Sequence, residues 1–402
     1  MSTTPSYTLI GINYWPEPTG NAPYNTDLAE MLSTKGEVTV ITGVPHYPWW
    51  QKQVGHNDHS YKLEHPNLNL VRRNHMVPKR NSNILRALME ITFGINVILS
   101  RKLSGDRIIL VSPAMLSSAV SLVWIRLRRP KAKVLLWVQD LYEQGIKETD
   151  QKGGFLSRIV FRIENWLLKN SDRVVMAHPG FLKAKLLSSD QNKQYFSLPN
   201  WSQFSFSPNE SECVTRSKYG FEKSRIVLHI GNIGVKQGLH KVIEAAEISQ
   251  LNEAKVVFVF VGGGNQLEIL REQSKEISSV VFIPPVTEEE LANLLQAADL
   301  LLVHELPGVK EMSIPSKLTT YFLSGKPVLV CSEPDSLAAK SVLENATGFW
   351  VKSGDPLALL AKIDTLDLEE AKTVVQVAKR YAEQNLSKSE ALAKFISIIN
   401  DF

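Results

Sequence analysis

The sequence has little cysteine and no long apolar run, and each absence restricts what the protein can be. Cys213 and Cys331 are the only cysteines and lie far apart, which excludes a disulfide framework and indicates a reducing compartment. The longest charge-free run, residues 108–125, barely reaches membrane-spanning length and contains Pro113 and four serines. A buried strand followed by a buried helix explains this run better. Residues 1–5 lack a basic region, which predicts no signal peptide and a cytoplasmic location.

Basic residues are concentrated in the first half of the chain, although the net charge is only +4. Between residues 72 and 102, seven residues are basic and only Glu90 is acidic, and a second basic cluster spans residues 126–133. This charge could be a solvated face, or it could attract an anionic membrane surface or a phosphorylated acceptor. Apolar segments at residues 84–99 and 155–168 could be helices at a bilayer interface or ordinary helices that cover a sheet. We expect an anionic membrane surface as a partner and no nucleic acid.

Short apolar strands alternate with helical segments in both halves of the chain. In the first half, strands are predicted at residues 7–12, 38–42, 107–111, 134–138 and 174–177. In the second half, they are predicted at residues 226–230, 256–261, 280–283, 300–303 and 327–330. This alternation requires parallel sheets with right-handed crossovers. We therefore predict an α/β protein with two doubly wound, Rossmann-like domains whose strand ends face one interdomain cleft.

Chain length and local composition predict where the domains divide. A chain of 402 residues is too long for one ordinary core, and residues 199–208 form a stretch rich in Ser, Asn and Pro. The predicted domains are therefore residues 1–203 and 204–385. Residues 386–402 are predicted to form a helix that could cross back to the first domain.

Glycine-rich turns and two lysines mark a candidate phosphate site in the second half. Gly231 and Gly234 follow one predicted strand and precede Lys236, and residues 262–264 follow the next strand. Lys317 stands on a Pro-bounded turn that enters a predicted helix. Backbone N–H groups at a helix start favour phosphate, and a lysine adds a full positive charge. These residues are typical of a nucleotide-diphosphate site, although surface lysines and tight turns would use the same residues.

Six short motifs in the same order carry a family resemblance over nearly the whole chain. They are Gly11–Tyr14 with Pro16–Gly20, Pro45–Pro48, Trp137–Leu141, Leu198–Trp201, Gly231–Gly234 and Pro315–Leu318. With these motifs the chain resembles the retaining glycosyltransferases of family 4, which have the GT-B fold. Within that family it is most similar to the branch of the colanic acid fucosyltransferase type. The resemblance implies transfer of a sugar from a UDP- or GDP-linked nucleotide sugar, with no further cofactor.

The resemblance also implies which domain binds which substrate. The first domain would bind the acceptor and the second would bind the nucleotide sugar. The predicted donor-binding residues are Gly231, Asn232, Gly234, Gly262, Gly263, Gly264, Val286, Glu305, Pro315 and Ser316. The predicted acceptor-binding residues are Glu17, Thr19, Gly20, Asn21, His46 and Gln139.

The chain departs from the family's usual residues at four positions. Many members have Arg where Asn232 stands, His where Gln139 stands, and glutamates where Met312 and Thr320 stand. Glu311 lies one residue from the first of these glutamate positions. The departures leave neutralisation of the donor phosphates mostly to the two lysines.

Four residues are predicted to carry the chemistry, namely Lys236, Lys317, Glu311 and Asp140. The lysines would stabilise the departing diphosphate. Glu305 and Glu311 flank the loop at residues 304–314, where carboxylates could bind sugar hydroxyls or simply be solvated. Asp140 follows a predicted strand and could orient an acceptor hydroxyl, act as a base, or cap a helix. The sequence contains no Asp-x-Asp, so we expect no metal site.

The first-half candidates have a structural alternative as well. His46 stands beside Tyr47, Trp49 and Trp50, and such a cluster suits carbohydrate stacking nearly as well as core packing. The whole pattern predicts a glycosyltransferase that builds a surface polysaccharide or glycolipid, peripheral at the inner face of the membrane, with a lipid-linked acceptor. A nucleotide-sugar epimerase, a glycogen-type synthase and a non-catalytic binding subunit remain alternatives on the same fold.

Overall fold

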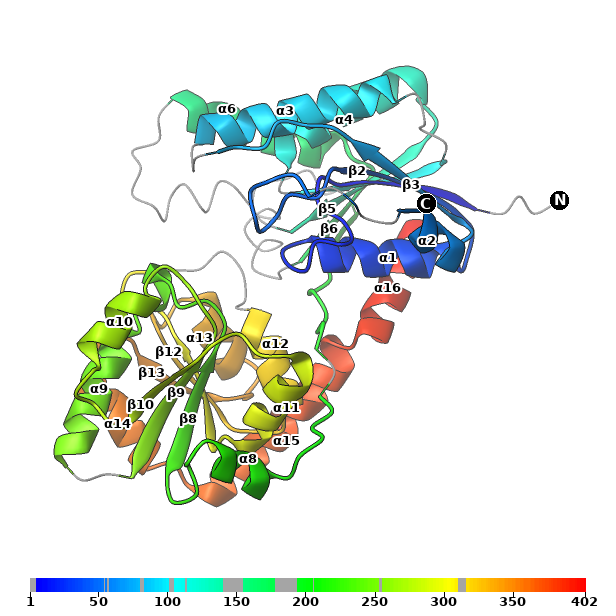
Figure 1. Ribbon diagram of the computed structural model, residues 1–402. Coiled ribbons are helices and arrows are strands. Elements are labelled where there is room, and N and C mark those ends of the chain that lie inside the picture. Colours follow the sequence, from blue (N-terminus) through cyan, green and yellow to red (C-terminus); the bar gives the residue numbers. More distant parts are fainter. Residues whose placement is uncertain are drawn as a thin grey trace. The chain divides into compact units, whose positions relative to one another are not determined.

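The computed structural model describes residues 5–53, 55, 58–79, 83–100, 105–112, 114–139, 155–177, 194–204, 206–252, 255–309 and 316–402. The chain divides into two compact units, each with its own sheet (Figure 1). Unit 1 comprises residues 1–200 and 389–402, and unit 2 comprises residues 201–388. The predicted boundaries at residues 203 and 385 each differ from these by three residues.

Unit 1 contains a seven-stranded sheet with the order β3-β2-β1-β4-β5-β6-β7, in which each strand is parallel to its neighbours. The strands are β1 Ser6–Ile10, β2 Glu37–Gly43, β3 Leu68–Arg73, β4 Arg107–Val111, β5 Lys133–Val138, β6 Arg173–Met176 and β7 Gln194–Ser197. The helices are α1 Ala22–Ser33, α2 Asp58–Glu64, α3 Asn83–Leu99, α4 Met115–Arg128, α6 Phe155–Asn170 and, from the C-terminal end, α16 Lys388–Asn400.

Helices α3, α4 and α6 form a layer on one face of this sheet, and α1 and α16 lie on the other (Figure 1). After its first residue, Arg107, strand β4 is wholly apolar and buried, as expected for a strand whose sheet is covered on both faces. Residues such as Phe93 of α3, Leu122 of α4 and Leu167 of α6 share one core with the central strands. Phe395 of α16 packs its ring 4.9 Å from that of Trp137, so the C-terminal helix belongs to unit 1.

Unit 2 contains a six-stranded parallel sheet with the order β10-β9-β8-β11-β12-β13. The strands are β8 Arg225–Ile230, β9 Val256–Val261, β10 Val280–Ile283, β11 Leu300–His304, β12 Val328–Ser332 and β13 Phe349–Lys352. The helices are α8 Glu212–Lys218, α9 His240–Leu251, α10 Leu267–Gln273, α11 Glu288–Ala297, α12 Ser316–Leu323, α13 Leu337–Leu343, α14 Pro356–Asp364 and α15 Leu368–Asn385, with a 3₁₀ turn η1 at Val235–Gln237.

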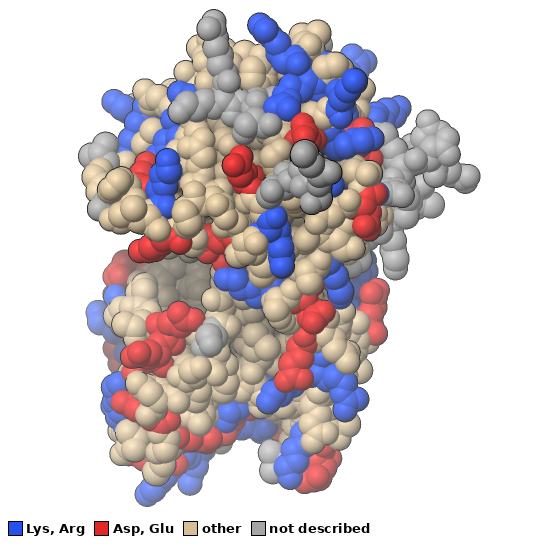
Figure 2. Space-filling view, turned by 90° about the vertical axis from the view of Figure 1, so that its right-hand side faces the viewer, with Lys and Arg blue, Asp and Glu red and all other residues tan. Residues whose placement is uncertain are grey.

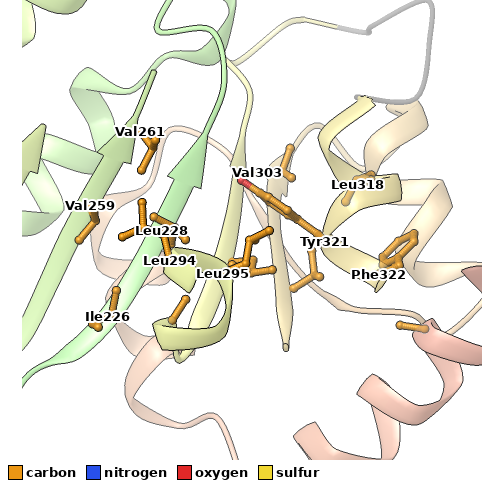
Figure 3. Close-up of a cluster of buried hydrophobic side chains, with 14 of the residues drawn as sticks. Ile226, Leu228, Val259, Val261, Leu294, Leu295, Val303, Leu318, Tyr321 and Phe322 are labelled. Atoms are coloured by element: carbon orange, nitrogen blue, oxygen red, sulfur yellow. The ribbon is translucent and has the colours of Figure 1, made fainter. Parts of the chain in front are cut away.

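Helix α12 is held against the unit 2 sheet by apolar side chains (Figure 3). Leu318, Tyr321 and Phe322 of this helix are almost fully buried and belong to one core with Leu228 of β8 and Val303 of β11. This packing fixes the first turn of α12 beside the ends of the central strands.

The structure confirms the predicted α/β class with two doubly wound parallel sheets. Strands β3, β7 and β13 were not predicted, and all three lie at the edges of their sheets. Within the described ranges, no helix combines the length and the apolar character needed to cross a bilayer.

Candidate active site

Two glycine-rich loops lie side by side at the carboxyl edge of the unit 2 sheet. Ile230, the last residue of β8, pairs in register with Val261, the last residue of β9, so the following loops start together. The Ile233 N–H donates to the Gly263 carbonyl at 2.9 Å, and the Gln266 N–H donates to the Ile233 carbonyl at 3.0 Å. The two loops therefore form one hydrogen-bonded layer where ligands of open parallel sheets usually bind.

Close packing of these two loops explains two of the three consecutive glycines. Gly262 has φ +140°, and a Cβ atom added there would lie 2.1 Å from the Gly231 carbonyl oxygen. A Cβ atom at Gly264 would lie 2.3 Å from the Ile233 carbonyl oxygen. Gly263 has open space, with no atom within 4 Å of an added Cβ. Loop packing thus requires Gly262 and Gly264, while the predicted contact of these glycines with a nucleotide stays a prediction.

Lys317 reaches the end of β8 from the first turn of α12. A Cβ atom built on Gly231 would lie 3.9 Å from the Lys317 Nζ atom, so the ammonium group lies over the start of the first loop. The Nζ atom also lies 3.2 Å from Nε2 of His229, the penultimate residue of β8. The predicted donor-binding residue Gly231 and the predicted catalytic residue Lys317 are therefore brought together.

His229 is fully buried, and sequence reasoning did not include it among the site residues. Its Nδ1 atom lies 3.1 Å from the Leu302 carbonyl oxygen on the neighbouring strand β11. Burial and the nearby Lys317 charge hold the pKa of His229 well below its ordinary value, against smaller opposing effects of two backbone hydrogen bonds. The sequence signal was a histidine inside an otherwise apolar strand directly before a glycine turn.

Lys236 lies in the 3₁₀ turn η1, which is tied to the loop that follows β11. The Lys236 carbonyl oxygen accepts the Leu306 N–H at 2.7 Å, and the Gln237 carbonyl oxygen lies 2.7 Å from Nδ1 of His304. The Gln237 side chain accepts the Gly234 N–H at 3.1 Å. The backbone of the turn is thus fixed, whereas the Lys236 side chain is exposed at its surface.

The other predicted donor-binding and catalytic residues differ in how far they are buried, and some of them lie outside the described residues. Glu305 is buried, with 2% of its surface exposed, so the alternative of a solvated loop carboxylate does not hold for it. Val286 packs at the border of the core that holds α12, and Asn232 is exposed. Asp140, Glu311 and Pro315 lie outside the described residues, as does the side chain of Ser316, whose backbone begins α12.

In unit 1, Glu17 connects two loops at the carboxyl edge of the sheet. One carboxylate oxygen accepts the backbone N–H groups of His46 at 2.7 Å and Tyr47 at 2.9 Å, and the other accepts from Asn13 Nδ2 at 2.7 Å. Burial alone would raise the pKa of Glu17, but the hydrogen bonds from His46 and Tyr47 outweigh it and hold the pKa below its ordinary value. Since both oxygens are engaged, the geometry favours a positioning role for Glu17, and its predicted acceptor contact stays a prediction.

His46 is also internal, since only 1% of its surface is exposed. Its ring lies 4.7 Å from the buried ring of His75, and its Nδ1 atom lies 3.3 Å from the Glu17 carboxylate. Burial lowers the pKa of His75 to about 4, so this ring is neutral at physiological pH. The core-packing interpretation therefore fits His46 better than carbohydrate stacking, while Trp49 nearby is exposed.

The remaining predicted acceptor residues lie at the same edge of the unit 1 sheet. Asn21 Nδ2 donates to the Ser112 carbonyl after β4, and Gln139 after β5 accepts from Asn200 Nδ2 at 2.7 Å. Gly20 has φ +69° and packs against Tyr47, and Thr19 is exposed. Polar side chains thus bind the loop after β1 to the loops after β2 and β4, and bind the loop after β5 to the segment after β7.

The fold of this chain is similar to that of several solved structures. Sucrose-phosphate synthase from Thermosynechococcus elongatus aligns with a TM-score of 0.75 and 16% identity, covering 99% of this chain and 98% of that one. HepE from Anabaena, solved in complex with UDP, aligns with a TM-score of 0.72 and 14% identity, covering 99% and 100%. Identities this low show the fold alone, which is the predicted GT-B fold of glycosyltransferases.

Sequence comparison shows the family. The family model described as "Glycosyl transferases group 1" matches residues 214–384. The chain is 30% identical to WcaI of Escherichia coli strain K12, named as a glycosyl transferase of colanic acid biosynthesis, over 97% of this chain and 98% of WcaI. The chain belongs to the group 1 glycosyltransferases.

Proposed function

We propose that this glycosyltransferase is a retaining enzyme of family 4, in the colanic acid fucosyltransferase-like branch. It moves a sugar from a nucleotide-diphosphate sugar to a lipid-linked glycan acceptor in surface polysaccharide or glycolipid synthesis. The observation that carries the proposal is the Lys317 ammonium group held beside Gly231 at the carboxyl edge of the unit 2 sheet. The relationship to WcaI supports the pathway class, and the UDP complex of the similarly folded HepE supports the donor class.

The donor diphosphate would lie against the two glycine-rich loops, between Lys317 and Lys236. Lys317 would supply charge from the partly buried first turn of α12, and Lys236 would supply it from the exposed turn η1. As the bond between the sugar and the diphosphate lengthens, negative charge builds up on the leaving diphosphate. Positive groups already in place stabilise this charge and so lower the activation barrier of the transfer. Asp140 and Glu311 keep their predicted roles near the acceptor hydroxyl and the donor sugar.

Retaining transfer at this site needs no protein nucleophile. The bond between the anomeric carbon and the diphosphate oxygen breaks as the acceptor oxygen forms its bond on the same face of the sugar. The acceptor proton then passes to the departing diphosphate oxygen, so charge and atoms balance. Because the two lysines supply the positive charge and the sequence has no Asp-x-Asp, we propose a metal-independent reaction. Turnover should then survive excess EDTA, and full loss that Mg²⁺ or Mn²⁺ restores would contradict this.

The acceptor would be presented at an anionic membrane by the layer of helices α3, α4 and α6. These three helices contain only two acidic residues, Glu90 and Glu164, and both are buried. Exposed basic residues lie on the same layer, including Arg86, Arg128 and Arg162. Lys and Arg side chains project from this end of unit 1, at the top of the view in Figure 2. A surface with outward positive charge is complementary to anionic lipid headgroups.

Apolar side chains on α3 add a second attraction to the membrane. Five residues repeat every three or four positions, so they lie on one side of the helix. They expose between 36% and 69% of their surface, and we call them the α3 ridge: Ile84, Leu88, Ile91, Ile95 and Leu99. Basic charge beside an exposed apolar ridge is the pattern of a helix that lies in a bilayer interface. This supports the proposed peripheral association at the inner face of the membrane.

Turnover of a panel of UDP-, GDP- and ADP-sugars tests the proposed function. We expect the protein to hydrolyse one class of donor slowly without acceptor, with release of the nucleoside diphosphate. Conversion of a donor to its 2-epimer would show an epimerase instead. Binding of a nucleotide sugar without turnover, even with lipid extracts as acceptor, would show a non-catalytic subunit. No binding of any donor would overturn the proposal.

A further inference from the structure

A buried histidine connects the central strands of unit 2 to the lysine at the proposed diphosphate site. His229 is 0% exposed, and its ring packs 6.1 Å from that of Phe260 on β9. Nδ1 faces the backbone of β11, Nε2 faces the side chain of Lys317 on α12, and the backbone of Asn232 also lies close to the ring. The ring thus connects strand β11 of the sheet to helix α12, which carries the Lys317 ammonium group.

The two partners determine which ring nitrogen carries the proton. The Leu302 carbonyl oxygen can only accept a hydrogen bond, so Nδ1 at 3.1 Å must be the donor. The Lys317 ammonium can only donate, so Nε2 at 3.2 Å must present its lone pair. Both requirements are met by one neutral tautomer. The lowered pKa of His229 agrees with a ring that stays neutral.

We infer that His229 is a positioning residue that holds the Lys317 ammonium group in place for the diphosphate of the donor. The inference rests on the proposed function, in which Lys317 binds that diphosphate. A carboxylate in the place of His229 would cancel the lysine charge, as Glu212 does for Lys326 at 3.3 Å. A neutral imidazole orients the ammonium without cancelling its charge. Lysine has three N–H donors, and the bond to His229 uses one of them.

Two amide substitutions separate the positioning role from a structural one. In His229→Gln, the side-chain carbonyl can reach the place of Nε2 and accept from Lys317. In His229→Asn, the shorter amide can donate to the Leu302 carbonyl in the place of Nδ1 but does not reach Lys317. The affinities for UDP and GDP, measured by calorimetry, are the readout, together with kcat and KM on the donor that the panel selects.

The positioning role predicts an order among these variants. For the nucleotide that the wild type binds, we expect His229→Gln to stay within about twofold and His229→Asn to weaken binding about tenfold, since hydrogen bonds to charged groups are strong. The loss in kcat should follow the same order. A larger loss in His229→Gln would indicate that the bond to Leu302 matters instead of the contact with Lys317. Equal effects would indicate that keeping the contact with Lys317 brings no advantage, and either result would overturn the inference.

Tyr321→Phe is the matched control for lost stability. The Tyr321 hydroxyl accepts the Ile230 N–H at 2.9 Å and lies 3.5 Å from the same Leu302 carbonyl oxygen, so its removal also breaks buried hydrogen bonds. We expect this variant to lower the melting temperature and leave nucleotide affinity within about twofold, since it spares the His229–Lys317 contact. A tenfold loss of affinity in Tyr321→Phe would show that destabilisation alone explains His229→Asn, and would overturn the inference.

The Lys317→Ala background distinguishes failure of the inference from failure of the proposed function. If His229 acts through Lys317, adding His229→Asn to Lys317→Ala should weaken nucleotide binding less than about twofold further. A full additional tenfold loss would overturn the positioning role. If Lys317→Ala itself leaves affinity and turnover unchanged, or the wild type binds neither UDP nor GDP, the proposed function fails and the inference fails with it.

Discussion

The carboxyl edges of the two sheets are built from different chemistry, although both belong to parallel, doubly wound sheets. In unit 2 the edge has glycine-rich backbone, a neutral histidine and the lysines Lys236 and Lys317. In unit 1 the edge has a buried carboxylate, Glu17, whose oxygens are engaged by backbone and amide donors. The first edge offers positive charge to a ligand, while the second uses its charge to bind its own loops together.

Under the proposed function, this contrast would let one fold hold two substrates of different character. A nucleotide diphosphate carries localised negative charge and needs fixed cations. A glycan acceptor is neutral at its hydroxyl groups and needs a rigid surface of hydrogen-bonding groups. In unit 1, exposed basic residues lie on the helix layer of α3, α4 and α6, where the proposed membrane association would use them.

Removing the central charge of the unit 2 edge should have the largest effect. We expect Lys317→Ala to lower kcat by about a hundredfold or more, with a smaller rise in KM, because the ammonium would stabilise the leaving group mainly in the transition state. Steady-state kinetics on the donor that the panel selects is the measurement. Lys326→Ala is the matched control, since Lys326 is already paired with Glu212. Activity within a few-fold of wild type in Lys317→Ala would contradict the assignment.

Neighbouring glycines should test how tightly the unit 2 loops are packed. In Gly262→Ala, the new Cβ would collide with the Gly231 carbonyl oxygen, so we expect the free energy of unfolding to fall by about 2–3 kcal/mol. In Gly263→Ala, nothing lies within 4 Å, so the change should stay within about 0.5 kcal/mol. Urea denaturation followed by tryptophan fluorescence compares the two. Equal destabilisation would mean that the loops do not pack as described.

Substitutions in the α3 ridge should show whether this surface binds a membrane or is only solvated. Wild-type protein is expected to float with anionic vesicles at low salt and to be released at high salt. The triple variant Ile84→Ser, Leu88→Ser, Ile95→Ser should bind about tenfold more weakly, since it loses apolar area that the bilayer would bury. Leu251→Ser, an exposed leucine on α9 of unit 2, is the matched control. If the wild type does not bind at low salt, the basic layer is a solvated face and the acceptor is soluble.

The smallest expected effect concerns the carboxylate of the unit 1 edge. Because the folded-state pKa of Glu17 lies below the ordinary value of 4.5, its charge stabilises the folded state above that pH. Glu17→Gln should therefore lower the free energy of unfolding by about 1 kcal/mol at pH 7. The difference from wild type should shrink as the pH falls below 4.5 and through the lowered pKa of Glu17. Denaturation series at pH 7 and pH 3.5 measure the difference in unfolding free energy between wild type and Glu17→Gln. A difference that is larger at pH 3.5 would contradict the stabilising role of the Glu17 charge.

The sequence predicted the central strands well because they are buried on both faces and read as apolar runs, as in β4 and β9. It missed β3, β7 and β13, which are three of the four edge strands, whereas the fourth, β10, is wholly apolar and was predicted. Edge strands have one neighbour and more contact with solvent, so polar residues such as Arg72 and Arg73 interrupt their pattern.

The candidate site was predicted in part, and the misses have physical causes. Lys317 and Gly231 were both named, because lysine and glycine turns are visible in the sequence. His229 was not named because its role depends on a contact with residue 317, far along the chain. Glu17 and His46 were correctly placed at a strand end, but their burial follows from hydrogen bonds between loops that no local pattern encodes.

Backbone hydrogen exchange with and without saturating UDP or GDP tests the central contrast most directly, since it reports on both edges in one experiment. We expect the bound nucleotide to slow exchange at residues 231–239 and 262–267 of unit 2 and to leave the amides of His46 and Tyr47 in unit 1 unchanged. Slowed exchange confined to unit 1, or unchanged exchange in unit 2 when nucleotide is bound, would contradict it.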